Sequence, residues 1–252
     1  MKIFASDIDN TLIPQKEKLE SGDIKELERF LSRINNLKVA YISGRSLHLI
    51  LQVMDDYYLP QPDFLVSDVG TAIYVFDNGS WVKSDDYEKY LFSDGYNRQS
   101  LEQQLSEIKN LTPQENEAQT DLKLSYYLDI DSERDKSLKK IESTLAKTPA
   151  QLIYSEDIVK RVGLVDIIPR KGGKAGALNF LAREVGASKE EVVYSGDSGN
   201  DLDALSAGFR GILVGNAPED LKQKLRKDHP GVYIAQNSFS KGVVEGLNYF
   251  LN

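Results

Sequence analysis

The sequence contains no cysteine. Disulfides, thiolate nucleophiles and zinc or iron–sulfur sites built from Cys are therefore excluded. The chain also lacks a Lys/Arg-rich run and has a formal net charge of -8, so we expect no nucleic-acid partner. No apolar stretch approaches the roughly 20 residues of a membrane helix. The start, MKIFASDIDN, turns polar too early for a signal peptide, so we expect a soluble, cytoplasmic protein without a membrane partner.

What the sequence does contain is an ordinary globular composition, 40% hydrophobic and 28% charged over 252 residues. Short apolar segments alternate with helical periodicity in the first third. KIFASD, VAYIS, DFLVSDVG and TAIYVFD read as strands, and IKELERFLSRI and LHLILQVMDDY read as helices. This alternation predicts a parallel sheet with helices on its faces.

The last third repeats this alternation, whereas the middle of the chain is more polar. EVVYSGD and GILVGNA are further strands, and AGALNFLAREVG is a helix that ends at Gly186. The middle combines a long helical segment, NRQSLEQQLSEIKN, with strands such as LKLSYYLDI. We therefore predict an α/β fold: a Rossmann-like, doubly wound parallel-sheet core (1–80 and 162–252) with an inserted α+β domain (81–161).

Polar residues stand where the predicted core strands end. They are Asp7 and Asp9 in DIDNTL, Ser43 in ISGRS, and Asp197 and Asp201 in GDSGND, with Lys174 before the helix that precedes the last of these. Ligands of open α/β sheets bind at the carboxyl ends of the strands, so these segments can converge on one crevice. Crowded carboxylates need a cation, and oxygen ligands suit Mg²⁺. A carboxylate can attack phosphorus while a second one acts as acid and base.

Each of these segments alone has a simpler interpretation. The Asp7–Asp9 pair could be a turn or a cap, and GDSGND could be a Gly-rich turn followed by an Asp N-cap. A single Lys is usually exposed, and Ser before Gly is a common turn residue. Their joint occurrence, in this order and each at a predicted strand end, favours a catalytic site.

The same segments resemble the signature of haloacid dehalogenase-like (HAD) phosphatases. DIDNTL matches its DxDxT motif, and ISGRS, the Lys of RKGGKAG and GDSGND follow in the family's order. The resemblance implies that Asp7 is the nucleophile, Asp9 the general acid/base, and Ser43 and Lys174 catalytic phosphate clamps. Ser43 stands where the family often has Thr, and either hydroxyl can donate the hydrogen bond.

The resemblance also implies the ligand sets. The Mg²⁺ site would comprise Asp7, the main-chain carbonyl of Asp9, Asp197 and Asp201, the last directly or through water. The phosphate site would comprise Asp7, Ser43, Gly44, Lys174 and Asn200. An insertion between the second and third motifs is where type IIB members carry their cap, so the resemblance implies that 81–161 is the substrate-specificity cap.

Among type IIB phosphatases the chain is most similar to the sucrose-6-phosphate phosphatases. The similarity lies in GRS, DVGTAIY, KLSYYLD and GDSGNDLDAL. It implies hydrolysis of sucrose 6-phosphate, the last step of sucrose synthesis, through an aspartyl-phosphate. Gly70 and Thr71 would expose amides and a hydroxyl to the sugar, although a plain hairpin turn is the alternative. The full set of predicted substrate contacts is Arg45, Gly70, Thr71, Tyr74, Lys123, Tyr126 and Tyr127. Tyr126 and Tyr127 alternate across a predicted strand, so we expect one of them in the core of the inserted domain and the other facing the cleft.

Other functions stay open at this point. The substrate could instead be another phosphorylated disaccharide or hexose, such as mannosylfructose phosphate. A sugar phosphomutase would share the cap and the aspartyl-phosphate, and a non-catalytic subunit would bind the synthase that makes the substrate. We expect a monomer with a small-molecule sugar phosphate as its partner, and the resemblance leaves an association with that synthase open.

Overall fold

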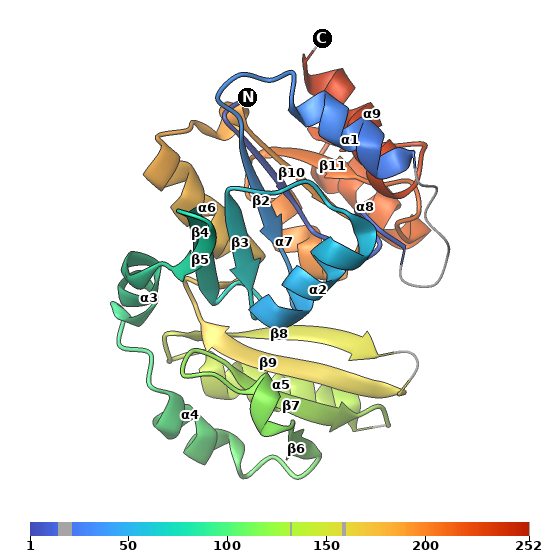
Figure 1. Ribbon diagram of the computed structural model, residues 1–252. Coiled ribbons are helices and arrows are strands. Elements are labelled where there is room, and N and C mark those ends of the chain that lie inside the picture. The colour runs from blue at the N-terminus through green and yellow to red at the C-terminus, as the bar shows by residue number, and fades with distance from the viewer. Residues whose placement is uncertain (15–21, 132, 158–159, 252) are drawn as a thin grey trace. The chain divides into compact units, whose positions relative to one another are not determined.

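The computed structural model describes residues 1–14, 22–131, 133–157 and 160–251 (Figure 1). The contacts within the chain divide it into two compact units. The larger unit comprises Met1–Ser84 and Lys174–Asn252, and the smaller unit is Asp85–Gly173. Part of the segment between KIFASD and IKELERFLSRI lies outside the described residues.

The larger unit is built on an eight-stranded sheet in the described part of the chain, in the order β12-β11-β10-β1-β2-β3-β4-β5. The strands from β12 to β3 are parallel, and β4 and β5 are antiparallel additions at one edge. Their bounds are β1 Ile3–Ser6, β2 Lys38–Ile42, β3 Phe64–Ser67, β4 Ala72–Asp77, β5 Ser80–Lys83, β10 Val192–Gly196, β11 Arg210–Leu213 and β12 Val232–Ile234. All four residues of β1 are buried, as expected for a central strand covered on both faces.

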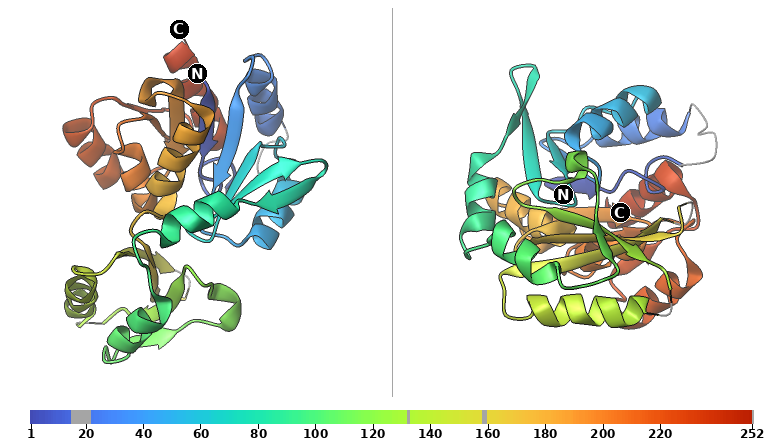
Figure 2. Two further views of the ribbon diagram at one scale, coloured as in Figure 1. Left: turned by 90° about the vertical axis from the view of Figure 1, so that its left-hand side faces the viewer. Right: turned by 90° about the horizontal axis from the view of Figure 1, so that it is seen from below.

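Helices cover both faces of this sheet (Figure 2). They are α1 Asp23–Leu31, α2 Leu47–Tyr57, α6 Gly173–Val185, α7 Leu202–Leu205, α8 Glu219–Asp228 and α9 Phe239–Leu251, with short 3₁₀ turns at Lys189–Glu191 and Gly199–Asp201. Buried residues of α1, α2 and α9 pack with Phe4 and Tyr41 into one core cluster. Leu178 of α6 and Leu225 of α8 are buried as well. The predicted doubly wound α/β core is confirmed.

The smaller unit has its own four-stranded antiparallel sheet, in the order β6-β7-β9-β8. Its elements are α3 Asp85–Phe92, α4 Arg98–Leu105, β6 Leu111–Pro113, a 3₁₀ turn at Asn116–Ala118, β7 Leu124–Asp129, α5 Arg134–Leu145, β8 Ala150–Asp157 and β9 Val162–Pro169. Figure 2 shows α5 against one face of this sheet. The unit is an α+β insertion in the chain of the larger one.

Several details differ from the sequence analysis. The segment Val162–Pro169, which the predicted boundary gave to the core, forms β9 and pairs with β7 and β8 of the smaller sheet. The long helix expected in NRQSLEQQLSEIKN is only Arg98–Leu105. In the segment LDALSAG, the α-helix is a single turn, Leu202–Leu205. Strands β5 and β12 and helix α3 were not predicted, because each is short or mostly polar.

The sheet reverses its direction of growth at β1. The chain passes from β1 through α1 to β2 on one side, and β10 pairs with the other edge of β1. Such a switch point opens a crevice at the carboxyl ends of the two strands. Within the described ranges, no helix has the length and apolar character needed to cross a membrane.

Candidate active site

The ends of three neighbouring strands bring the predicted catalytic segments together. Ser6, the last residue of β1, is level with Ser195 on β10 and with Tyr41 on β2. The amide of Asp7 donates to the carbonyl of Ser195 at 2.9 Å. Because the strands are parallel, the segments that follow them leave the same edge of the sheet. Asp7, Ser43 and Asp197 therefore start from adjacent positions along that edge.

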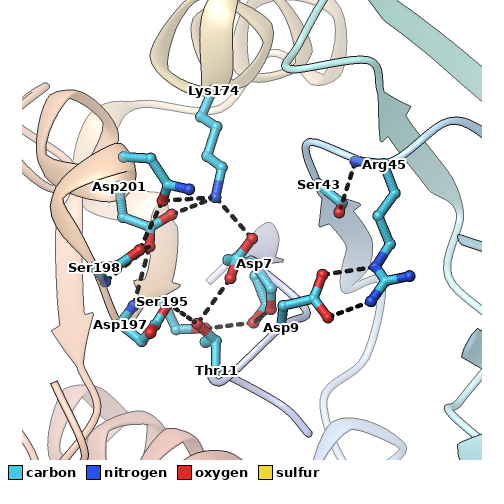
Figure 3. A network of polar contacts seen from close by, with 12 residues as sticks. Asp7, Asp9, Thr11, Ser43, Arg45, Lys174, Ser195, Asp197, Ser198 and Asp201 are labelled. Carbon is cyan, nitrogen blue, oxygen red and sulfur yellow. Dashed lines mark hydrogen bonds and ion pairs between the residues drawn. The ribbon is translucent and has the colours of Figure 1, made fainter. Parts of the chain in front are cut away.

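Asp7 lies at the centre of the cluster and is 5% exposed. Lys174 Nζ donates to its Oδ1 at 2.7 Å, and Thr11 Oγ1 donates to its Oδ2 at 3.1 Å. Figure 3 shows Asp7 between these two side chains, with Asp9 on the side of Arg45. Ile8 between the two aspartates is fully buried, which fixes the chain so that both carboxylates reach the site.

Lys174 has three N–H donors and an acceptor for each. They are Asp7 Oδ1 at 2.7 Å, Asp201 Oδ1 at 2.7 Å and Asn200 Oδ1 at 3.3 Å. Burial on its own would lower the pKa of Lys174, but the carboxylates of Asp201 and Asp7 raise it above its usual value. The ammonium therefore stays charged inside the protein and can offset negative charge beside Asp7.

Asp201 is fully buried, and hydrogen-bond donors surround its carboxylate. Lys174 Nζ and Tyr194 Oη donate to Oδ1 at 2.7 and 2.5 Å, and the amides of Asp197 and Ser198 donate to Oδ2 at 3.0 and 3.1 Å. Since a carboxylate has about four lone-pair positions, this set fills them. Asp201 therefore orients Lys174 and the amides of Asp197 and Ser198, and a metal ion would compete with these donors for its oxygens.

The position of Asp201 also explains a glycine in the preceding strand. A Cβ atom on Gly196 would lie 2.5 Å from Asp201 Cγ, so any larger residue would displace the carboxylate. Gly196 is therefore needed for steric reasons, while Asp197 beside it is needed for its carboxylate.

The residues present fit a divalent cation. Oxygen atoms of Asp7, Asp197 and Asp201 lie within 4.8 Å of one another, and all three residues are buried. Burial raises the pKa of Asp7 to about 8 and the pKa of Asp197 to about 7, and the neighbouring carboxylates add to both shifts. Raised pKa values mean that these crowded carboxylates hold protons more readily than exposed ones, as expected for groups that need a cation. Thr11 Oγ1 makes a long contact with Asp197 Oδ1 at 3.4 Å, so this carboxylate is held less tightly than that of Asp201 and suits metal binding.

The other predicted phosphate-site residues occupy the loops around this cluster. Ser43 is 1% exposed and accepts a hydrogen bond from the amide of Arg45 at 3.2 Å. Gly44 follows it in the same turn. Asn200 accepts from Lys174 and from Ser198 Oγ. The described geometry is compatible with an anion-binding role for Ser43, which stays a prediction.

The predicted sugar contacts in the larger unit do not all lie open. Thr71 is 2% exposed, and its hydroxyl donates to the carbonyl of Asp68 at 2.8 Å. Gly70 is in the left-handed region with φ 81°. Tyr74 packs against the apolar core cluster of the unit. Arg45 binds Asp9 through its guanidinium, so a contact with substrate would have to displace that partner.

In the smaller unit the two neighbouring tyrosines of β7 have different surroundings. Tyr126 is 6% exposed and alternates with buried Leu124 and Leu128, so it belongs to the core of the unit. Tyr127, on the opposite face of the strand, donates to Glu115 Oε2 at 2.8 Å. The predicted alternation is present, and it removes Tyr126 from the candidate sugar contacts. Lys123 is buried.

Sequence reasoning missed two buried contributions to the site. Tyr194 on β10 donates to Asp201, and its own pKa is raised well above the usual value by burial and by that carboxylate. Ser195 Oγ donates to Ser6 Oγ at 2.8 Å, which donates to the carbonyl of Asp7 at 2.6 Å. The available signal was polar residues inside otherwise apolar strands that end at the DxD and GD motifs.

A family comparison agrees with this geometry. The model of the family "Sucrose-6F-phosphate phosphohydrolase" matches residues 1–251. The chain belongs to this family. The resemblance to HAD-like phosphatases that the motifs indicated is thereby confirmed, and the fold class is the HAD-type Rossmann-like core with an inserted unit.

Individual relatives cover almost the whole chain of this family member. A protein of Nitrosococcus oceani with the name of a HAD-like hydrolase is 34% identical over 98% of this chain and 71% of its own length. A mannosylfructose-phosphate phosphatase of Agrobacterium fabrum is 27% identical over 99% of this chain and 97% of its own length. The solved sucrose-phosphatase of Synechocystis sp. PCC6803, in complex with sucrose and phosphate, is 26% identical with a TM-score of 0.84 over 98% of this chain and 97% of its own.

Family membership and the relatives support a phosphatase that acts on a sugar phosphate. HAD phosphatases generally use a divalent metal, and the cluster of Asp7, Asp197 and Asp201 is where this phosphatase could hold one.

The raised pKa values predict how the metal-free phosphatase responds to pH. Between pH 3.8 and about 8 the folded chain keeps a proton on Asp7 that the unfolded chain has lost. The free energy of unfolding should therefore fall as pH rises through this interval. Asp7→Asn removes that titration, so in EDTA the variant should gain stability relative to the wild type as pH rises. Urea unfolding of both proteins at pH 5 and pH 8.5 measures the difference, and equal pH dependence would contradict it.

Proposed function

We propose that this phosphatase hydrolyses sucrose 6-phosphate to sucrose and phosphate, with Mg²⁺ and through an aspartyl-phosphate on Asp7. The observation that carries the mechanism is the buried Asp7 carboxylate, held by Lys174 and Thr11 next to Asp197 at the end of the central strand. The substrate assignment is supported by the family match and by the likeness to a sucrose-phosphatase solved with sucrose and phosphate.

In the first step an Asp7 carboxylate oxygen attacks phosphorus as the bond from phosphorus to the sugar oxygen breaks. Asp9 donates a proton to that leaving oxygen, which departs as the sugar hydroxyl. The Asp7 oxygen that reacts must be free of its protein donor. The contact from Thr11 to Oδ2, at 3.1 Å, is longer than the 2.7 Å ion pair of Lys174 with Oδ1. We therefore assign the attack to Oδ2.

In the second step water attacks the same phosphorus and the Asp7 carboxylate leaves. Asp9, now without its proton, accepts one from the water, so both carboxylates return to their starting state. Phosphate departs with the water oxygen. Throughout, the Lys174 ammonium and the Ser43 hydroxyl would hold phosphoryl oxygens as negative charge moves among them.

A bound Mg²⁺ would supply positive charge to the transferring phosphoryl group. Asp7, Asp197 and the main-chain carbonyl of Asp9 would hold it, and Asp201 would keep Asp197 and Lys174 in place through the hydrogen bonds described above. In the buried cluster the carboxylates of Asp7, Asp197 and Asp201 outnumber the Lys174 ammonium, which favours binding of a divalent ion.

We assign substrate selection to the inserted α+β unit and to the turn at Gly70 and Thr71. Tyr127 is the candidate sugar contact of that unit that lies nearer the surface, since Tyr126 and Lys123 are both 6% exposed. A cap of this kind would exclude water and contact the sugar part of the substrate, remote from phosphorus.

The assignment predicts a clear order of substrates. Phosphate release in the presence of Mg²⁺ should show a kcat/KM for sucrose 6-phosphate at least about a hundredfold above those for glucose 6-phosphate and fructose 6-phosphate, because a disaccharide-specific site loses contacts with the smaller sugars. Mannosylfructose phosphate belongs in the same panel, since a relative that matches 99% of this chain is named as a phosphatase for that compound.

Two outcomes of this panel would contradict the proposal. Equal kcat/KM on all four compounds would indicate a general sugar phosphatase, and a preference for mannosylfructose phosphate would assign that substrate instead. Analysis of the products separates a mutase from a phosphatase, because a mutase returns an isomerised sugar phosphate and releases no free sugar.

A further inference from the structure

Asp9 and Arg45 form a two-point ion pair. Arg45 Nε lies 2.7 Å from Asp9 Oδ2, and Arg45 Nη2 lies 2.8 Å from Asp9 Oδ1 (Figure 3). Their side chains are 32% and 20% exposed, so the pair is largely shielded from water. Among the described residues, no other hydrogen bond to the Asp9 carboxylate is found. Arg45 alone therefore fixes the direction of this side chain.

The backbone of Arg45 is itself held on both sides. Its amide donates to Ser43 Oγ at 3.2 Å, and its carbonyl accepts from the amide of Asp68 at 2.8 Å. Asp68, Val69 and Gly70 have φ values of 52°, 58° and 81° in succession. Val is β-branched and rarely adopts this conformation, so the turn persists only because its surroundings hold it. The guanidinium thus extends from a fixed point of the larger unit.

We propose that Arg45 is a positioning residue for Asp9 in the phosphoryl-transfer reaction and acts on the leaving oxygen only through that carboxylate. This inference rests on the proposed roles of Asp7 and Asp9. A bidentate guanidinium restricts the rotation of the carboxylate about its last bond, which a monodentate ammonium does not. It would keep Asp9 on the leaving-group side of phosphorus, apart from the Lys174 cluster that holds Asp7.

The geometry also defines what happens during proton transfer. A carboxylate that accepts two N–H bonds carries no proton to donate, so one of the two bonds must open when Asp9 is protonated. The second bond keeps the side chain in place. When Asp9 gives its proton to the leaving oxygen, both bonds can form again.

The alternative is that Arg45 contacts the substrate itself, as the sequence suggested. A double-mutant cycle separates the two roles. The variants are Arg45→Ala, Asp9→Asn and the double variant, with Arg45→Lys as the conservative change. The substrates are phenyl phosphate and p-nitrophenyl phosphate, which contain no sugar and differ in how much their leaving group needs a proton. Because these substrates contain no sugar, the role of Arg45 can be tested whether or not sucrose 6-phosphate is the natural substrate.

We expect Arg45→Ala to lower kcat/KM for phenyl phosphate by about 10- to 100-fold, as for a displaced general acid. The loss should be much smaller with p-nitrophenyl phosphate, whose leaving group departs without help. In the Asp9→Asn background, Arg45→Ala should lower kcat/KM for phenyl phosphate by less than about twofold, because the carboxylate that Arg45 positions is already absent. Arg45→Lys should recover part of the activity, and the inhibition constant of inorganic phosphate should stay within about twofold of the wild type.

Two results would overturn the proposal. Additive losses in the cycle, with weaker inhibition by phosphate in both backgrounds, would show that Arg45 binds the phosphoryl group directly. Full activity of Arg45→Ala on phenyl phosphate would show that Asp9 needs no partner. Arg29→Ala, at an exposed position of α1, is the matched control and should leave all these values unchanged. Thermal unfolding of each variant checks that the fold is retained, and Arg45→Gln replaces Arg45→Ala if that variant unfolds.

Discussion

Asp7→Asn is expected to reduce phosphatase activity at least about a thousandfold, because it removes the nucleophile and leaves only binding and electrostatic stabilisation. The amide has nearly the same shape as the carboxylate and can still bind Thr11. It also removes one buried carboxylate from the crowded cluster that Asp7 forms with Asp197 and Asp201. The variant should therefore fold and still bind the sugar phosphate, so the loss should appear in kcat.

The matched control for this change is Asp203→Asn. Asp203 is an exposed residue of α7, two positions after Asp201, and has no place in the proposed mechanism. Its activity should equal that of the wild type. Release of phosphate from sucrose 6-phosphate measures both variants. If Asp7→Asn kept more than about a tenth of the activity, Asp7 would not be the nucleophile.

Lys174→Met is expected to lower both activity and stability. The side chains of its partners Asp7 and Asp201 are 6% and 0% exposed, so the variant leaves two buried carboxylates without their shared cation. Removing one partner of a buried ion pair typically costs about 3–5 kcal/mol of unfolding free energy. Activity should fall about 100- to 1000-fold, since the ammonium also offsets charge on the phosphoryl group.

A second variant and a control separate the two effects. Lys174→Met combined with Asp201→Asn removes one of the unpaired charges and should recover part of the stability but none of the activity. Lys38→Met breaks the exposed pair with Asp63, whose side chains are 47% and 32% exposed, and should cost at most about 1 kcal/mol. Urea unfolding in EDTA compares all three. A similar cost for Lys174→Met and Lys38→Met would contradict the buried-pair account.

The positions of the site residues could be predicted from the sequence because the chemistry dictates residue types at strand ends. Asp7, Ser43 and Asp197 each follow an apolar strand, and a parallel sheet brings such ends to one edge. Lys174 could be placed by motif order alone. The structure adds the strand order, which puts β10 and β2 on either side of β1.

The hydrogen bonds that hold these residues could not be predicted. Tyr194 looks like one more large residue of a buried strand, and only the fold of the following turn brings Asp201 back over it. The hydrogen bond from Ser195 to Ser6 forms because the two residues are paired in register on adjacent strands. The pair of Arg45 with Asp9 joins residues 36 positions apart, so Arg45 was interpreted as a substrate contact.

The inserted unit was predicted in kind but not in detail. Its strand β9 has the same apolar pattern as a core strand, and only its pairing with β7 and β8 assigns it to the smaller sheet. Helix α4 ends after Leu105, although the polar sequence beyond it is compatible with helix. Alternation predicted that one tyrosine of β7 would be buried, but the pattern alone could not say which one.

The central claim is that Asp7 carries the phosphoryl group between sugar and water. The most direct test is rapid quenching of the enzyme with ³²P-labelled sucrose 6-phosphate and Mg²⁺, followed by digestion and mass spectrometry. We predict label that turns over within the reaction, bound to a peptide that contains Asp7 and absent from Asp7→Asn. Turnover of the sugar phosphate with no label on the chain at any time, or label on another residue, would contradict the account.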